Sequence, residues 1–218
     1  GVDELLQFSV ERAVIAVPSI ESEIMENEIG YLRLYTFGSS TSEEAREAVR
    51  NFLDMEIEGL ILDLRNNTGG YVDAAIDTAS IFIEDGIIMI EEWGDGTRNE
   101  YEATGEILLS DLPMVVIVNG GSASASEIVA GALQDYDRAE LVGTQTFGKG
   151  LIQNWIPLVD ENGAVRITTA RWLTPEGRQI QGDGLTPDNI ISFSEESAES
   201  GNDIQIEAAL SILREGLE

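Results

Sequence analysis

Apolar positions along the chain fall into two patterns, which together predict the fold class. Residues 59–64 and 114–118 are short, nearly continuous apolar runs, typical of strands covered on both faces. Each run is followed by a turn with two adjacent glycines and then by a segment with helical spacing of its apolar residues. Repeated strand–turn–helix units indicate an α/β fold with a mostly parallel sheet.

Further elements are predicted from the same patterns. Strands are expected at residues 8–17, 29–35 and 139–142, and helices at residues 41–55, at 72–82, from the serines near 124 to about 134, and at 203–214. Two hairpins should join residues 86–90 to 98–103 and residues 152–158 to 165–171, and residues 194–202 should form a polar loop. The first helix should turn Ala45, Val49, Phe52 and Leu53 inward, and the last should carry Ile206, Ala209, Leu210 and Leu213 on its apolar face.

The net charge of the chain limits the classes of molecule that it is expected to bind. The chain has 218 residues and a net charge of −29, from 41 acidic and 12 basic side chains. Such a charge disfavours nucleic acid and anionic membrane surfaces as partners, because both carry negative charge. No apolar run is long enough to span a membrane and no signal peptide opens the sequence. We expect any targeting segment to lie upstream of Gly1.

The sequence contains neither cysteine nor histidine. Disulfides, thiol catalysis, cysteine zinc sites and a Ser-His-Asp triad are therefore excluded. A nucleophilic serine in this chain would need activation by lysine, a carboxylate or a terminal amine. The acidic residues show no EF-hand spacing, and we expect neither a metal nor another cofactor.

Lys149 is the only lysine in the chain, and the other eleven cationic residues are arginines. A lysine can act as a general base when burial or a cationic neighbour lowers its pKa, whereas arginine does not deprotonate in proteins. Phe147 is expected to exclude water from this lysine. The alternatives are a chance surface lysine and a phosphate loop, since Gly143, Gly148 and Lys149 fit G-x-x-x-x-G-K. Gly150 stands where that loop needs Ser or Thr, and a strand rather than a helix is predicted next.

Ser122, Ser124 and Ser126 lie between a predicted buried strand and a predicted helix. Free backbone N–H groups at the helix N-terminus could stabilise an oxyanion beside a serine nucleophile. The alternative is helix capping by one of the serines, with Glu127 as an acid in the first turn. Spacing alone does not choose between these interpretations. Residues 66–70 are likewise either a ligand-binding loop or a plain turn.

Taken together, these segments resemble the C-terminal processing peptidases, the tail-specific serine proteases of peptidase family S41. Matching motifs recur in the right order over roughly residues 8–190. They are GYLRL at residues 30–34, DLRNNTGG at 63–70, GSASASEIVAGALQD at 121–135 and VGTQTFGKGLIQ at 142–153. Thr68 departs from the pattern, because the family usually has proline there.

The resemblance implies a Ser–Lys dyad. Ser124, the middle serine of the cluster, matches the family nucleophile, Lys149 matches the base, and Gln153 matches the residue that orients the lysine. Gly70 and the N–H of Ala125 match the oxyanion hole. Asp135 matches a recurring acid to which we assign no role.

The resemblance also implies a fold: an α/β, ClpP/crotonase-like core with a mostly parallel sheet flanked by helices, plus β-hairpins that form a small cap region. We expect residues 1–28 to be the end of a PDZ-like region leading into the core, residues 29–192 to be the S41 protease core, and residues 193–218 to be a polar loop and an amphipathic helix. The chain has no room for the PDZ domain that these proteases usually carry, and we expect a core that lacks it.

The expected function is a serine endopeptidase that hydrolyses peptide bonds near protein C-termini. Its expected partners are polypeptide substrates bound in extended form. Nucleic acid is not expected as a partner, and no membrane segment is expected in this chain. A homo-oligomer is possible from the sequence. The family implies an extracytoplasmic location, in the periplasm, in the cell envelope or as a secreted protein. The alternative function is a non-catalytic ligand- or peptide-binding module on the same fold.

Overall fold

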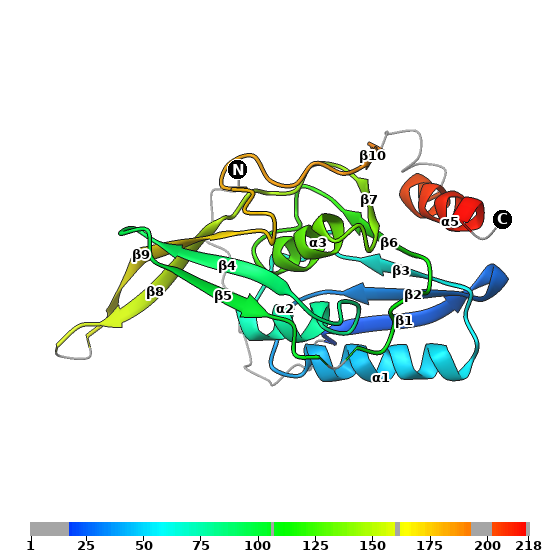
Figure 1. The fold of residues 1–218 in the computed structure, drawn as a ribbon, viewed down its shortest axis with the longest axis horizontal. Helices are drawn as coiled ribbons and strands as arrows, with labels where there is room; N and C mark the ends of the chain where they lie inside the picture. Colours follow the sequence, from blue (N-terminus) through cyan, green and yellow to red (C-terminus); the bar gives the residue numbers. More distant parts are fainter. Residues whose placement is uncertain (1–17, 106, 160–161, 193–201, 217–218) are drawn as a thin grey trace, which may run out of the picture.

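The computed structural model describes residues 18–105, 107–159, 162–192 and 202–216 (Figure 1). Within them the chain forms two β-sheets and four α-helices. The larger sheet has helices on both faces, and the smaller one stands at one end of the molecule. This arrangement agrees with the predicted α/β fold with additional hairpins.

The larger sheet is mostly parallel, as predicted. Its strand order is β1-β2-β3-β6-β7-β10, and β1 is antiparallel to β2 while the other neighbours are parallel. The strands are β1 (Ile20–Met25), β2 (Ile29–Leu34), β3 (Gly59–Asp63), β6 (Met114–Val118), β7 (Glu140–Gly143) and β10 (Asn189–Ile190). A short 3-10 turn, η1 (Glu26–Glu28), connects β1 to β2.

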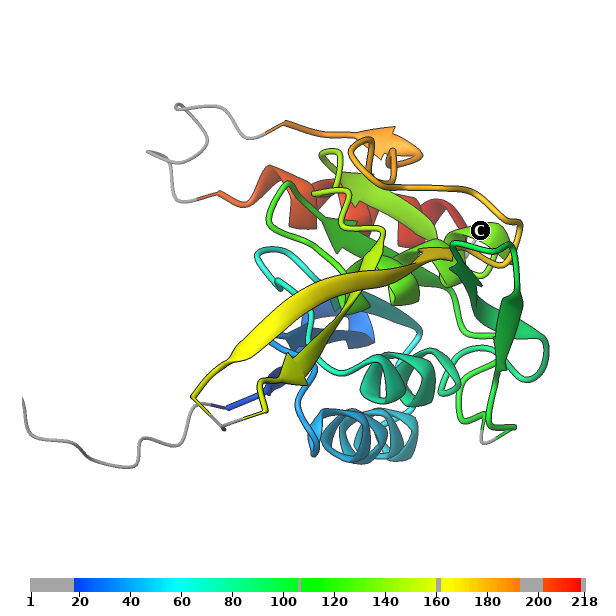
Figure 2. The ribbon, with the colours of Figure 1, turned by 90° about the vertical axis from the view of Figure 1, so that its left-hand side faces the viewer.

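Helices cover both faces of this sheet because its strands alternate their apolar side chains between the two sides. Leu32, Leu60 and Leu62 pack into the core cluster that holds α1 (Thr41–Asp54), α2 (Val72–Ala79) and α3 (Ala125–Asp135). Tyr31 and Ile61 face the opposite way and pack with Ala209 of α5 (Ile204–Gly216). Figure 2 shows α1 and α2 on one side of the sheet and α5 on the other.

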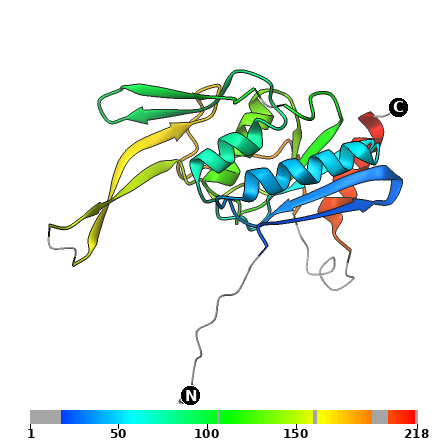
Figure 3. The ribbon, with the colours of Figure 1, turned by 90° about the horizontal axis from the view of Figure 1, so that it is seen from below.

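The smaller sheet is antiparallel, with the order β5-β4-β9-β8. Its strands are β4 (Ile87–Trp93), β5 (Arg98–Glu102), β8 (Leu151–Pro157) and β9 (Ala164–Leu173). β4 stops pairing with β9 at Ala170, whereas β8 follows β9 as far as Ala164. Residues 153–157 and 164–168, here called the arm, therefore project from the body of the protein (Figures 1 and 3).

Most predicted elements are confirmed, and three details are wrong. Leu53 was expected to turn inward but is 41% exposed, α2 ends at Ala79 rather than near residue 82, and β1 and β10 were not predicted. The predicted strand at residues 8–17 and the predicted polar loop, apart from Asn202, lie outside the described residues. β1 extends the core sheet back to residue 20, before the predicted boundary at residue 29, and the domain division itself stays a prediction.

None of the helices that the structure describes combines the length and the apolar character needed to cross a membrane.

Candidate active site

The three serines of the cluster have different environments. Ser122 and Ser126 are fully buried, and their hydroxyl groups donate hydrogen bonds to the carbonyl oxygens of Leu64 (2.8 Å) and Asn67 (2.7 Å). Ser122 therefore fastens the segment before α3, and Ser126 the first turn of α3, to the residues that follow β3. Ser124 is half-buried and lines a cavity.

Ser124 also has an unusual backbone conformation. Its φ of 57° and ψ of −115° lie in a region that residues other than glycine rarely adopt. Such a conformation costs about 1–3 kcal/mol and persists where the surrounding structure holds it. It falls at the turn between β6 and α3, a strand–turn–helix geometry that exposes a side chain at the end of a parallel sheet.

Glu127 supplies the contacts that hold this turn. Its carboxylate is fully buried and accepts four hydrogen bonds. Oε2 binds the backbone N–H groups of Ser124 (2.8 Å) and Lys149 (2.9 Å). Oε1 binds the Thr146 hydroxyl (2.6 Å) and the N–H of Gly148 (2.7 Å). The interpretation of Glu127 as a helix-capping acid is thus incomplete, because it also ties the serine turn to the lysine loop.

Lys149 is held through its backbone on both sides. Its N–H binds Glu127, and its carbonyl oxygen accepts a hydrogen bond from the Trp172 indole N–H (2.9 Å). The next residue, Gly150, accepts from the N–H of Trp172 (2.9 Å) and donates to the side chain of Gln181 (2.9 Å). The lysine is therefore fixed between the α/β core and the smaller sheet.

A cavity of about 220 Å³ brings four of the predicted site residues together: Gly70, Ser124, Lys149 and Gln153. The rest of its lining is mostly apolar and comes from Val72, Met89, Ile128, Leu151, Ile152 and Trp172, with Arg166 as a second cation. The expectation that Phe147 shields the lysine is wrong, because this side chain is 62% exposed. Trp172 and the aliphatic residues of the cavity form the apolar surroundings instead.

The fifth predicted residue, Ala125, is buried beside the turn that contains Gly69 and Gly70. A Cβ atom on Gly69 would lie 2.9 Å from the backbone nitrogen of Ala125 and 2.9 Å from the Cβ of Ser124. A Cβ atom on Gly70 would lie 2.1 Å from the carbonyl oxygen of Phe37. Within the described part of the chain, the N–H groups of Gly70 and Ala125 donate no hydrogen bond. Both are therefore available to an acceptor from outside.

A buried polar cluster that sequence reasoning did not single out lies at the end of β3, where the chain enters the segment that leads to the glycine turn. Asp63 is fully buried and accepts hydrogen bonds from the Tyr31 hydroxyl (2.7 Å) and the Arg65 guanidinium (2.6 Å). Arg65 also binds Asp203, just before α5 (2.7 Å). Burial and the carboxylate of Asp63 raise the pKa of Tyr31. The Asp-Leu-Arg spacing at the end of a buried strand was the available signal.

Gln153 and Asp135 have separate environments. Gln153 lies at the start of the arm, where its side-chain amide donates to the Thr168 hydroxyl (3.4 Å). Asp135 lies at the C-terminal end of α3, outside the cavity, where it forms an ion pair with Arg178 and accepts from the N–H of Glu176 (2.8 Å). It therefore fastens α3 to the turn after β9.

The phosphate-loop alternative is wrong. β8 begins at Leu151, directly after the lysine loop, so no helix N-terminus follows Lys149.

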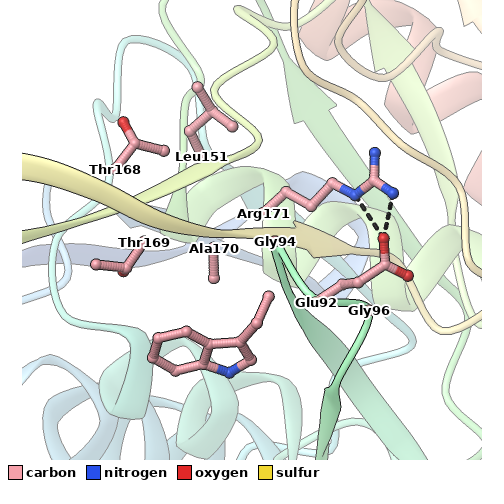
Figure 4. A pocket seen from close by; sticks show the side chains of 9 residues that line it. Glu92, Gly94, Gly96, Leu151, Thr168, Thr169, Ala170 and Arg171 are labelled. Atoms are coloured by element: carbon pink, nitrogen blue, oxygen red, sulfur yellow. Dashed lines mark hydrogen bonds and ion pairs between the residues drawn. The ribbon is translucent and has the colours of Figure 1, made fainter.

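A second, more open cavity of about 480 Å³ adjoins the first and shares Leu151 with it. It lies where β4 ends beside β9, and Figure 4 shows the ion pair between Arg171 and Glu92 at its wall. No group of three or more acidic side chains within the described residues is arranged to hold a metal ion.

Comparisons with known proteins agree with this geometry. The family model described as "Peptidase family S41" matches residues 28–191. The carboxy-terminal-processing protease of Bartonella bacilliformis is 42% identical over 196 residues, which cover 88% of this chain and 45% of that protein. The carboxyl-terminal-processing protease of Synechocystis sp. is 38% identical over 226 residues, covering 100% of this chain and 52% of that one.

A solved structure of a photosystem II D1 C-terminal processing protease matches with a TM-score of 0.76 and 35% identity. The match covers 82% of this chain and 49% of the other. The chain thus spans about half the length of the relatives that it matches.

Proposed function

Because the chain belongs to peptidase family S41, we propose that it is a serine endopeptidase in which Ser124 and Lys149 form a catalytic dyad. The observation that carries the proposal is the cavity lined by Gly70, Ser124, Lys149 and Gln153. Ser124 is also the one serine of its cluster whose hydroxyl is not engaged with a backbone carbonyl.

In the proposed reaction, neutral Lys149 takes the proton from the Ser124 hydroxyl as the oxygen attacks a peptide carbonyl carbon. The N–H groups of Gly70 and Ala125 stabilise the negative charge on the carbonyl oxygen. The ammonium of Lys149 then protonates the leaving amine, and the C–N bond breaks to leave an acyl-enzyme. Water, deprotonated by Lys149, hydrolyses the ester and restores Ser124. Gln153 orients the lysine side chain.

Two observations support the oxyanion role. Both N–H groups are free of acceptors within the described residues, and the backbone of Gly69 lies against Ser124 and Ala125. The N–H of Ala125 belongs to the first residue of α3, where the helix dipole favours negative charge.

The proposed substrates are polypeptides bound in extended form and cleaved near their C-termini. A substrate strand could pair with an open edge of the smaller sheet, since β8 has no neighbour on its outer side among the described strands. A homo-oligomer and an extracytoplasmic location are also part of the proposal, and both rest on the family.

Digestion of casein or of a tailed peptide by wild type, Ser124→Ala and Lys149→Ala tests the proposal. We expect cleavage by wild type alone. Equal cleavage by all three proteins would refute the dyad, whereas an inactive wild type that retains a bound ligand would favour the non-catalytic module. No feature of the cavity favours the module over the peptidase.

A further inference from the structure

Arg166 differs from five other arginines of this acidic chain in having no carboxylate partner among the described residues. Carboxylate partners are present for Arg50, Arg65, Arg98, Arg171 and Arg178. Arg166 has none within the described part of the chain, although the protein carries 41 acidic residues. It is exposed and lines the same cavity as Ser124 and Lys149. A cation left without a partner at this place is available to a ligand.

The register of the arm shows which way Arg166 faces. Residues directly opposite each other on antiparallel strands share a face, and Arg166 is opposite Trp155 while Thr168 is opposite Gln153. Because side chains alternate along a strand, Arg166 and Thr168 lie on one face of β9. The register shift at Ile152/Gln153 interrupts this alternation on the inner side of Thr168. Arg166 and Gln153 both line the cavity that holds Ser124 and Lys149, so the face of the arm that bears Arg166 leads out of the catalytic cavity.

Trp155 orients the guanidinium without neutralising it. The Arg166 Cζ atom lies 5.8 Å from the centre of the Trp155 ring, in a cation–π contact. Stacking on a ring leaves the in-plane N–H donors of an arginine free to bind a planar anion in a bidentate manner. By contrast, Arg171 on the same strand is occupied by Glu92, as Figure 4 shows.

We infer that Arg166 is a specificity-determining residue that binds a carboxylate of the peptide substrate. An unmodified polypeptide carries negative charge only as Asp or Glu side chains and as its C-terminal carboxylate, and either source fits the guanidinium. Arg166 lies two residues along β9 from Thr168, which is opposite Gln153. At about 3.3 Å per residue, the carboxylate would lie roughly two to four residues from the scissile bond. The inference rests on the proposed function, because it assumes a peptide in the cavity.

The test is a glutamate scan. Peptides of one length carry Glu or Gln at each of the four positions on either side of the scissile bond, and kcat and KM are measured by mass spectrometry. We expect wild type to favour Glu at one or two positions by about tenfold in kcat/KM, mainly through KM, because a remote contact binds substrate and transition state alike. The preference should shrink as salt is added.

The variants separate a local contact from net charge. Arg166→Gln should lose the preference for Glu while cleaving the Gln peptides normally, and Arg166→Lys should keep part of it. Arg214→Gln, on α5 at the opposite end of the molecule (Figure 1), removes the same charge and should leave the preference unchanged. Free-acid and amidated peptides that end at the favoured position distinguish a C-terminal carboxylate from a side chain.

Binding to the Ser124→Ala variant, followed by intrinsic tryptophan fluorescence, gives a second readout that needs no catalysis. If wild type cleaves every peptide without preferring Glu or a free C-terminus, or if Arg166→Gln keeps the preference, the inference is wrong and the dyad stands. If no peptide is cleaved, the proposed dyad is wrong. In that case the inference is still supported if peptide binding depends on the carboxylate and if the Arg166→Gln substitution abolishes this dependence. Binding that ignores the carboxylate would overturn it.

Discussion

Ser124 and Lys149 share one hydrogen-bond acceptor: the Oε2 atom of Glu127 binds the backbone N–H of both residues, at 2.8 and 2.9 Å. The two residues come from different loops, and the shared oxygen fixes the distance between their backbones. The carboxyl group is fully buried, and its two oxygen atoms accept four hydrogen bonds from N–H and O–H donors.

Glu127→Gln should therefore disturb both stability and activity. The substituted amide would place an NH₂ donor against an N–H or O–H donor, which leaves buried groups unsatisfied. We expect a loss of about 3 kcal/mol in the free energy of unfolding, measured in urea, and a large loss of peptidase activity. Glu47→Gln, an exposed change on α1, is the control and should alter neither. A Glu127→Gln protein with wild-type stability would contradict the conclusion that the four hydrogen bonds of Glu127 hold the two loops together.

Replacing Ser124 by glycine and by alanine separates its conformation from its chemistry. Both variants should be inactive, because neither has a nucleophile. Ser124→Gly should be more stable than Ser124→Ala by about 1 kcal/mol, since the positive φ of 57° is easier for glycine. Thermal unfolding of the two variants gives the comparison. The opposite order would mean that the turn relaxes when the side chain is lost.

Lys149→Arg should be inactive although it keeps the positive charge. Arginine does not deprotonate in proteins, so it cannot accept the serine proton. Cleavage of a chromogenic peptide measures the loss, which we expect to match that of Lys149→Ala. Stability should change little, because the contacts of Lys149 to Glu127 and Trp172 are made by its backbone. Near-normal activity of Lys149→Arg would remove Lys149 as the base.

Gly70→Ala should lose activity for a steric reason. Its Cβ atom would lie 2.1 Å from the Phe37 carbonyl oxygen, so the turn that carries the proposed oxyanion donor has to move. We expect a cost of about 3 kcal/mol in unfolding free energy. Gly177→Ala is the matched control: its φ is +81° but nothing lies within 4 Å of the new atom, so it reports strain without a clash. Full activity in both variants would exclude a positional role for Gly70.

The ion pairs of Glu92 predict a pH dependence of stability. Arg171 and Arg98 lower the pKa of Glu92 below its ordinary value of 4.5. A carboxyl group with a lowered pKa in the folded state contributes stability above its ordinary pKa, and that contribution is lost as pH falls through the folded value. The difference in unfolding free energy between wild type and Glu92→Gln should therefore be largest near pH 7 and shrink below about pH 4.5.

Glu100→Gln removes an exposed carboxylate of the neighbouring strand β5 and serves as the control for Glu92→Gln. It should show no comparable change with pH. A Glu92→Gln difference that stays constant from pH 7 to pH 3 would show that the arginines do not stabilise the carboxylate.

The strands and helices with strong apolar patterns were predictable, and the missed ones have physical reasons. β1 is an exposed edge strand in which Glu21, Ser22 and Glu23 face solvent, so it has no apolar alternation. β10 has only two residues, and its pairing with β7 depends on the tertiary fold. Leu53 follows the helical spacing of the buried face of α1, yet it lies one residue before the end of the helix, where it is exposed.

In the candidate active site, too, some features were predictable from the sequence and others depend on the tertiary fold. Sequence spacing did not choose among three serines, because their difference lies in which hydroxyl meets the carbonyl groups of residues 64 and 67. Glu127 looked like a capping acid because its first partner is three residues away. Its other partners, in residues 146–149, come from a loop that only the fold brings to it.

The smaller sheet and the larger sheet contribute different parts of the site. The proposed nucleophile Ser124 and the glycine turn belong to the α/β core, whereas Gln153 and Arg166 belong to the arm, and Lys149 lies in the loop that connects the two. The proposed site is therefore complete only when both sheets are folded. A molecule whose smaller sheet had opened would keep a correctly shaped serine turn and still be inert, so the core alone does not make the catalyst.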